Sequence, residues 1–80
     1  MTDGFIVTRE GDAFRVAGKR IERIAAQTNF EIDESAERFQ RDLARFGIDD
    51  ELRRAGIVPG DLVRIGVSEL EWEAQPWEDA

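Results

Sequence analysis

The chain has 80 residues, of which 41% are hydrophobic and 36% are charged, and its formal net charge is −7. It contains neither cysteine nor histidine, which excludes disulfides, zinc sites with thiolate or imidazole ligands, and Ser-His or Cys-His nucleophile pairs within the chain. The length fits one domain with a small core. No apolar run is long enough for a membrane span, and the cytoplasm is the expected location.

The charges are unevenly distributed along the chain. Residues 15–68 contain ten basic and ten acidic side chains, whereas residues 69–80 contain five acidic ones and no basic one. A domain that binds nucleic acid over its whole surface is usually basic, so this class of partner is disfavoured. One basic surface on the neutral central part of the chain stays open as an alternative.

Two β-prone runs begin the chain, at residues 5–8 and 13–17. Glu10-Gly11-Asp12 separates them and is typical of a short turn. Apolar residues alternate with other residues in both runs, as Phe14 and Val16 do in the second. The pattern predicts a hairpin with one apolar face.

Helical periodicity follows. Ile21 and Ile24 predict a short amphipathic helix over residues 19–27. Asp33 is the expected N-cap of a longer helix, and Gly47 is suited to a left-handed cap at its C-terminal end. The apolar stripe of this longer helix consists of Ala36, Phe39, Leu43 and Phe46.

A third, shorter helix is expected next. Asp49 is its predicted N-cap, and the helix is expected to run through Leu52 to Ala55. Gly56 then ends it, in the same way that a glycine ends the longer helix.

The last part of the chain is again β-prone. Pro59-Gly60 is typical of a type II turn. Residues 62–67 predict a strand, Ser68 is expected at a bend, and residues 70–74 predict a last strand whose exposed face carries glutamates. Regular structure is expected to end before residues 75–80.

Together these elements predict an α+β fold. About four strands are expected in one sheet, as two hairpin-like pairs, with two to three helices packed on one face. No linker divides the chain, so residues 1–74 are predicted to form a single domain and residues 75–80 an acidic C-terminal tail.

No motif predicts catalysis. At Gly18-Lys19, a phosphate-binding P-loop would need glycine at position 13 and serine or threonine at position 20, but these positions hold Ala13 and Arg20. The glutamates at positions 69, 71 and 73 are typical of a solvated edge strand protected by charge, and a magnesium or calcium site on them is the weaker alternative. We therefore expect no catalytic, cofactor-binding or metal-binding residue in this chain.

Two features are candidate interaction sites. Lys19, Arg20 and Arg23 share one side of the first predicted helix. They form either an ordinary solvated helix face or a contact surface for phosphate groups of RNA or of an anionic nucleotide. Trp77 follows Pro76 in the acidic tail. It either docks onto a partner as an anchor or folds back onto the sheet.

The chain also resembles a known family over about residues 5–74. The resemblance lies in an ordered succession of blocks, and the set is more specific than any single block. The blocks are Phe14–Arg23, Thr28–Phe30, Ser35–Arg41, Leu43–Ile48, Leu52–Gly56, Gly60–Gly66 and Leu70–Trp72. Their order resembles the C-terminal domain, or OCT domain, of the Obg family of ribosome-associated GTPases.

This resemblance implies a non-catalytic regulatory or interaction domain. In the family, GTP and Mg²⁺ are used by a separate GTPase domain, which is expected to be absent from this chain. The implied context is ribosome assembly and stress or growth control. The implied partners are the other domains of the parent GTPase, the large ribosomal subunit or another protein. Direct nucleic-acid binding stays open, as does the question of an excised domain or a free-standing relative.

Overall fold

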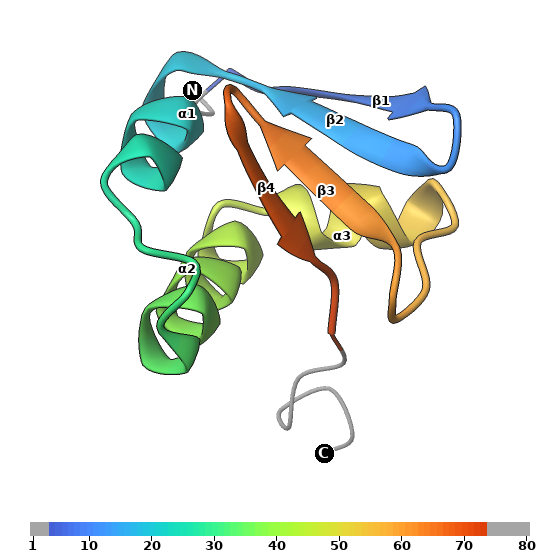
Figure 1. The fold of residues 1–80 in the computed structure, drawn as a ribbon. Coiled ribbons are helices and arrows are strands. Elements are labelled where there is room, and N and C mark those ends of the chain that lie inside the picture. The colour runs from blue at the N-terminus through green and yellow to red at the C-terminus, as the bar shows by residue number, and fades with distance from the viewer. Residues whose placement is uncertain (1–3, 74–80) are drawn as a thin grey trace.

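A computed structural model of the chain describes residues 4–73. It contains four strands and three helices (Figure 1). In chain order they are β1 (Ile6–Glu10), β2 (Ala13–Ala17), α1 (Lys19–Ala26), α2 (Asp33–Arg45), α3 (Ile48–Arg54), β3 (Leu62–Ile65) and β4 (Ser68–Glu71). The predicted α+β class is confirmed.

The four strands form one mixed sheet in the order β1-β2-β3-β4. β1 pairs antiparallel with β2, and β3 pairs antiparallel with β4, so both predicted hairpins are confirmed. The two hairpins join through a parallel pairing of β2 with β3, in which Phe14 lies opposite Val63 and Val16 opposite Ile65. A parallel pairing needs a crossover connection, and the three helices supply it on one side of the sheet (Figure 1).

Both hairpins turn through two residues that begin with glycine. Gly11 and Gly66 each have a φ of 61°, and the residue after each has no positive φ, which is the type II′ arrangement. The turn at Gly66 corrects two predictions: the third strand ends at Ile65 rather than at residue 67, and Ser68 begins β4 instead of bending it. The alternation of buried and exposed residues in β3 is as expected. The chain reverses at Gly66, a position that the sequence predicted to be part of the strand.

The two aspartates predicted as N-caps lie inside their helices. The capping residue of α2 is Ile32 and that of α3 is Gly47, and neither makes a side-chain capping bond. Gly47 has a φ of 80°. Only Phe46 and Gly47 separate α2 from α3, and the capping position of α3 is occupied by Gly47, which has no side chain that could cap the helix. Asp33 and Asp49 instead place negative charge in the first turn, where the helix dipole favours it.

The core lies between the sheet and the helices. Phe14 and Val16 of β2 and Val63 and Ile65 of β3 are fully buried, because alternate side chains of the central strands point to the same face. The helices add Ile21, Ala25, Phe39, Leu43, Ile48 and Leu52. Trp72 alternates with the glutamates in the last predicted strand, which places it on the apolar face, and it is 3% exposed. Within residues 4–73, no helix combines the length and the apolar character needed to cross a membrane.

Candidate interaction surfaces

The predicted basic side of α1 is exposed. Lys19, Arg20 and Arg23 all lie at the surface, while Ile21 on the opposite side is buried. The helix begins at Gly18, whose N–H donates to the Glu22 carboxylate at 2.9 Å. That carboxylate lies where a bound anion would meet the helix N-terminus, so a phosphate at Gly18 is disfavoured.

Arg20 does not extend freely into solvent. Its guanidinium group lies 5.1 Å from the centre of the Phe46 ring, and the guanidinium group of Arg45 lies 5.3 Å from the same ring. Each such contact is worth about 0.5–1 kcal/mol at an exposed site. Phe46 therefore contacts two guanidinium groups, one from α1 and one from α2.

A polar hollow of about 210 Å³ lies between α1 and α2. Ile24 and Phe39 contribute its apolar lining. Amide, hydroxyl and charged groups complete the lining, from Gln27, Thr28, Asn29, Ser35, Arg38 and Asp42. The lining offers hydrogen-bond donors and acceptors, with one basic side chain, Arg38, and one acidic side chain, Asp42.

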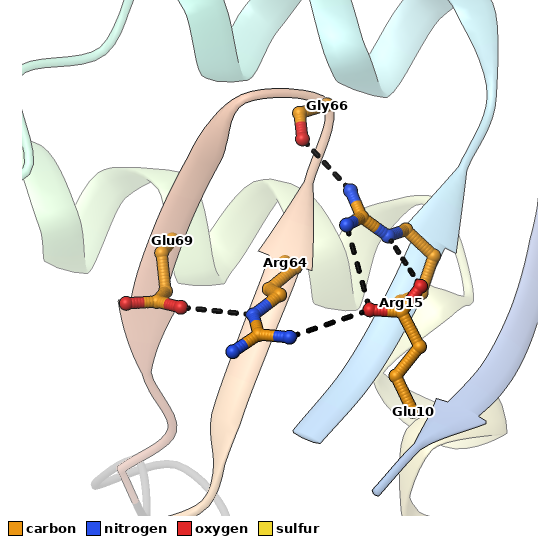
Figure 2. Close-up of polar contacts among 5 residues, drawn as sticks. All are labelled: Glu10, Arg15, Arg64, Gly66 and Glu69. Carbon is orange, nitrogen blue, oxygen red and sulfur yellow. Dashed lines mark hydrogen bonds and ion pairs between the residues drawn. The ribbon is translucent and has the colours of Figure 1, made fainter.

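In the part of the chain that the structure describes, no helix covers the opposite face of the sheet (Figure 1), and charged side chains cross it. Figure 2 shows the arrangement, which links all four strands. Glu10 of β1 accepts hydrogen bonds from Arg15 at 3.1 Å and from Arg64 at 3.4 Å. Arg64 also donates to Glu69 of β4 at 2.9 Å, and Arg15 donates to the carbonyl oxygen of Gly66 at 2.8 Å. We refer to these four charged side chains as the outer-face network.

The network changes the acid–base properties of its members. Hydrogen bonding to Arg15 lowers the pKa of Glu10, and the bond to Glu69 raises the pKa of Arg64. Glu10 therefore contributes to the free energy of unfolding at pH values above its unfolded-state pKa. This contribution is lost as the pH falls through the lowered folded-state pKa. Because these groups are exposed, solvent screens them and the contribution is small. The network mainly fixes side-chain positions on the open face.

The spacing of residues in the sequence did not predict this network. Strand alternation places Arg15, Arg64 and Glu69 opposite the apolar residues, which is a correct signal for an exposed face. The pairing itself depends on the parallel register that sets Arg15 beside Arg64 and on the antiparallel register that sets Arg64 beside Glu69. Glu69, one of the glutamates expected on a solvated edge strand, thus forms an ion pair with Arg64 at 2.9 Å.

Asp49 is a buried carboxylate on α3. Its Oδ2 atom forms an ion pair with Arg53 at 3.0 Å, whereas Oδ1 is buried and has no hydrogen-bond partner among residues 4–73. Burial raises the pKa of Asp49, and the Arg53 charge opposes this only in part. Protonated Asp49 thus contributes to the free energy of unfolding at pH values below its unfolded-state pKa. This contribution is lost as the pH rises through the raised folded-state pKa.

Asp49→Asn is therefore expected to stabilise the protein at neutral pH, by about 1 kcal/mol or less because the contact with Arg53 is weakened at the same time. The gain should disappear at pH values where the aspartate is protonated in both states. Urea unfolding at acidic and at neutral pH measures this. A variant less stable than the parent at neutral pH would show that the ion pair outweighs burial.

Within the described residues, 4–73, the chain contains no group of three or more acidic, histidine or cysteine side chains placed to hold a metal ion. Trp77, the other candidate anchor, lies outside the described residues, as does the predicted tail.

Comparison with known proteins points to one family. Residues 5–72 match the model of a domain of unknown function, DUF1967. The chain is 52% identical over 71 residues to the GTPase Obg of Chloroflexus aggregans, which covers 89% of this chain and 16% of that protein. It is 44% identical over 72 residues to the GTPase Obg of Desulforudis audaxviator, covering 90% and 17%. With the GTPase Obg of Brevibacillus brevis it shares 40% identity over 70 residues, covering 88% and 16%.

The chain thus spans about one sixth of the length of these relatives. No solved structure matches the chain. The region of similarity, residues 5–72, includes every helix and strand described above.

Proposed function

Since this chain belongs to the DUF1967 family, the C-terminal domain of Obg GTPases, we propose that it is a regulatory interaction domain with no catalytic residue of its own. The observation that carries the proposal is the match of nearly the whole chain to a small part of GTPases. GTP and Mg²⁺ would then act in other domains of the parent protein, outside this chain. The proposed setting is the cytoplasm, in ribosome assembly and in stress or growth control.

The exposed surface supports an interaction role. The helix-free side of the sheet holds the outer-face network in fixed positions, and Ile6 of β1 is 65% exposed. Val67, in the turn between β3 and β4, is fully exposed. Apolar side chains beside ordered charges are typical of protein contact surfaces. The proposed domain comprises residues 1–74, with residues 75–80 as a tail, and its partners are the remaining domains of the parent GTPase or the large ribosomal subunit.

A domain exchange tests this proposal. The matching 71 residues of the Chloroflexus aggregans GTPase Obg would be deleted in one variant and replaced by this chain in another. We expect the deletion to change the rate of GTP hydrolysis or the association with ribosomes, and the replacement to restore the parent's behaviour. If the deletion changed neither property, the regulatory role would be lost.

A second candidate function is binding of RNA or another anion through the basic side of α1. Two observations favour it: Lys19 and Arg23 are exposed, and the guanidinium groups of Arg20 and Arg45 both contact the Phe46 ring. These groups would contact phosphates without reading base sequence. The outer-face network, in which acidic and basic side chains balance each other, would take no part in this binding.

If this second function holds, the affinity for ribosomal RNA should depend steeply on salt. Three phosphate contacts predict a slope of about −2 for log K against log salt concentration on a single-stranded region. Charge reversal of Lys19, Arg20 and Arg23 to glutamate should abolish binding, which a filter-binding or fluorescence titration measures. Binding that ignored salt, or that survived the reversal, would count against it.

A further inference from the structure

A groove of about 250 Å³ runs between β4 and the first two turns of α2. β4 is an edge strand of the sheet, with β3 on its other side (Figure 1). The apolar part of the groove is formed by Phe30, Ala36 and Leu70. Phe30 is half-buried and packs edge-to-face against Phe39, with ring centres 5.1 Å apart. The groove is therefore backed by the core, which keeps its shape fixed.

The groove is bordered by backbone groups that the sheet does not use. The N–H of Trp72 donates to the carbonyl oxygen of Asp61, and the carbonyl oxygen of Trp72 accepts from Gly60. Backbone groups alternate in direction along an antiparallel strand. The N–H and C=O groups of residues 68, 70 and 72 therefore point toward β3. The N–H and C=O groups of Glu69 and Glu71 then face away from the sheet. Among the backbone hydrogen bonds of residues 4–73, none satisfies these outward groups.

The ends of this edge are tied to the helices. The Ser68 hydroxyl donates to the carbonyl oxygen of Ala25 at 3.4 Å, and the Gln40 amide donates to the carbonyl oxygen of Glu73 at 2.7 Å. Between these contacts, a short stretch of strand stays open beside the groove. An edge with unpaired backbone groups next to a helix is the arrangement in which an extended peptide adds to a sheet.

The acidic lining of the groove favours a basic partner. Four carboxylates, from Asp33, Glu69, Glu71 and Glu73, line it, and no basic side chain does. Within residues 4–73, Glu69 has Arg64 as a partner, whereas neither Asp33 nor Glu71 forms an ion pair. A second copy of this chain pairing through β4 would place glutamates beside glutamates, which is unfavourable for cross-strand neighbours.

We propose that this groove binds an extended basic segment of a partner protein, which adds to the sheet beside β4. Side chains of the partner that lie beside Glu69 and Glu71 would be lysine or arginine, because neighbours across a sheet share a face. The alternate side chains would enter the groove toward Phe30 and Leu70 and would be apolar. The partner is thus a segment in which basic and apolar residues alternate. This inference names a partner for the proposed interaction domain and so rests on that proposed function.

The test uses the 80-residue chain, labelled for NMR, and a short peptide of alternating lysine and valine. We expect the amide signals of Glu69 and Glu71 to shift on titration and their hydrogen exchange to slow. A version of this peptide with N-methyl groups on the alternate residues whose N–H groups would bond to β4 should bind at least about tenfold more weakly than the unmethylated peptide. The reason is that main-chain hydrogen bonds carry this mode of binding. A peptide of alternating glutamate and valine should not bind.

Two protein variants separate the site from general charge attraction. Glu71→Lys should weaken binding by about tenfold, because it places like charges together at the contact. Asp12→Lys, with the same change in net charge on the turn between β1 and β2, should change affinity by less than about twofold, since salt screens distant charges. Equal effects of both variants, or no shift at Glu69 and Glu71 at millimolar peptide, would overturn the proposal. The domain exchange in the Obg GTPase does not use this peptide, so either result can fail alone.

Discussion

Phe39→Ala is expected to remove a large part of the stability of the domain. Phe39 of α2 is 1% exposed and lies in the same core as Phe14 and Val63 of the sheet. Removing a buried phenylalanine side chain costs about 3–5 kcal/mol. A domain of this size has a total stability of only about 4–12 kcal/mol. The edge-to-face contact with Phe30 would be lost as well.

Urea unfolding followed by circular dichroism measures this loss. With a slope of about 1 kcal/mol per molar urea, the midpoint should fall by about 3 M or the folded baseline should vanish. Val67→Ala is the matched control, because Val67 is fully exposed and its truncation should change stability by less than about 0.5 kcal/mol. Equal stability of the two variants would mean that Phe39 does not occupy the core.

Gly18→Ala is expected to be the second most damaging change. Gly18 joins β2 to α1, and a Cβ atom added there would lie 2.6 Å from the carbonyl oxygen of Gly4 and 3.1 Å from the Cβ atom of Phe5. These are atoms of the chain just before β1, which move only with the backbone. The backbone of Gly18 is extended, with a φ of 172°, so the cost is steric crowding and not a left-handed conformation. Crowding of this kind costs about 1–3 kcal/mol.

The appropriate control is Gly4→Ala. A Cβ atom at Gly4 would meet nothing within 4 Å, so this variant should match the parent in thermal unfolding. Gly18→Ala should unfold at a temperature several degrees lower, by about 4–8 °C for each 1 kcal/mol lost. A Gly18→Ala variant as stable as Gly4→Ala would indicate that the start of β1 is not packed against this junction.

Local patterns predicted most of the fold. Alternation identified Phe14, Val16 and Trp72 as core residues, and helical periodicity identified Phe39 and Leu43. Local patterns say nothing about which strands pair across a long connection, so the parallel pairing of β2 with β3 was not predicted.

The turn and cap errors have local causes. A Gly-Val pair inside an apolar run resembles strand until the left-handed φ of Gly66 is known. The predicted aspartate caps failed because Ile32 occupies the capping position of α2 and Gly47 occupies that of α3.

The candidate surfaces were predictable only in part. The exposure of Lys19, Arg20 and Arg23 follows from the helical period, but the contact of Arg20 with Phe46 depends on how α1 and α2 pack. The outer-face network needs the register of all four strands, and the groove beside β4 needs the position of α2 against a strand far along the chain. Features that combine distant segments cannot be obtained from spacing alone.

The most direct measurement of the central claim is an NMR titration of this chain with an Obg GTPase that lacks its own matching region, in the GDP-bound and GTP-bound states. An interaction domain should show amide shifts confined to exposed surfaces, namely the outer-face network, the basic side of α1 or the edge of β4, while buried amides such as those of Val63 and Ile65 stay unchanged. No shift in either nucleotide state, with or without large ribosomal subunits, would contradict the account.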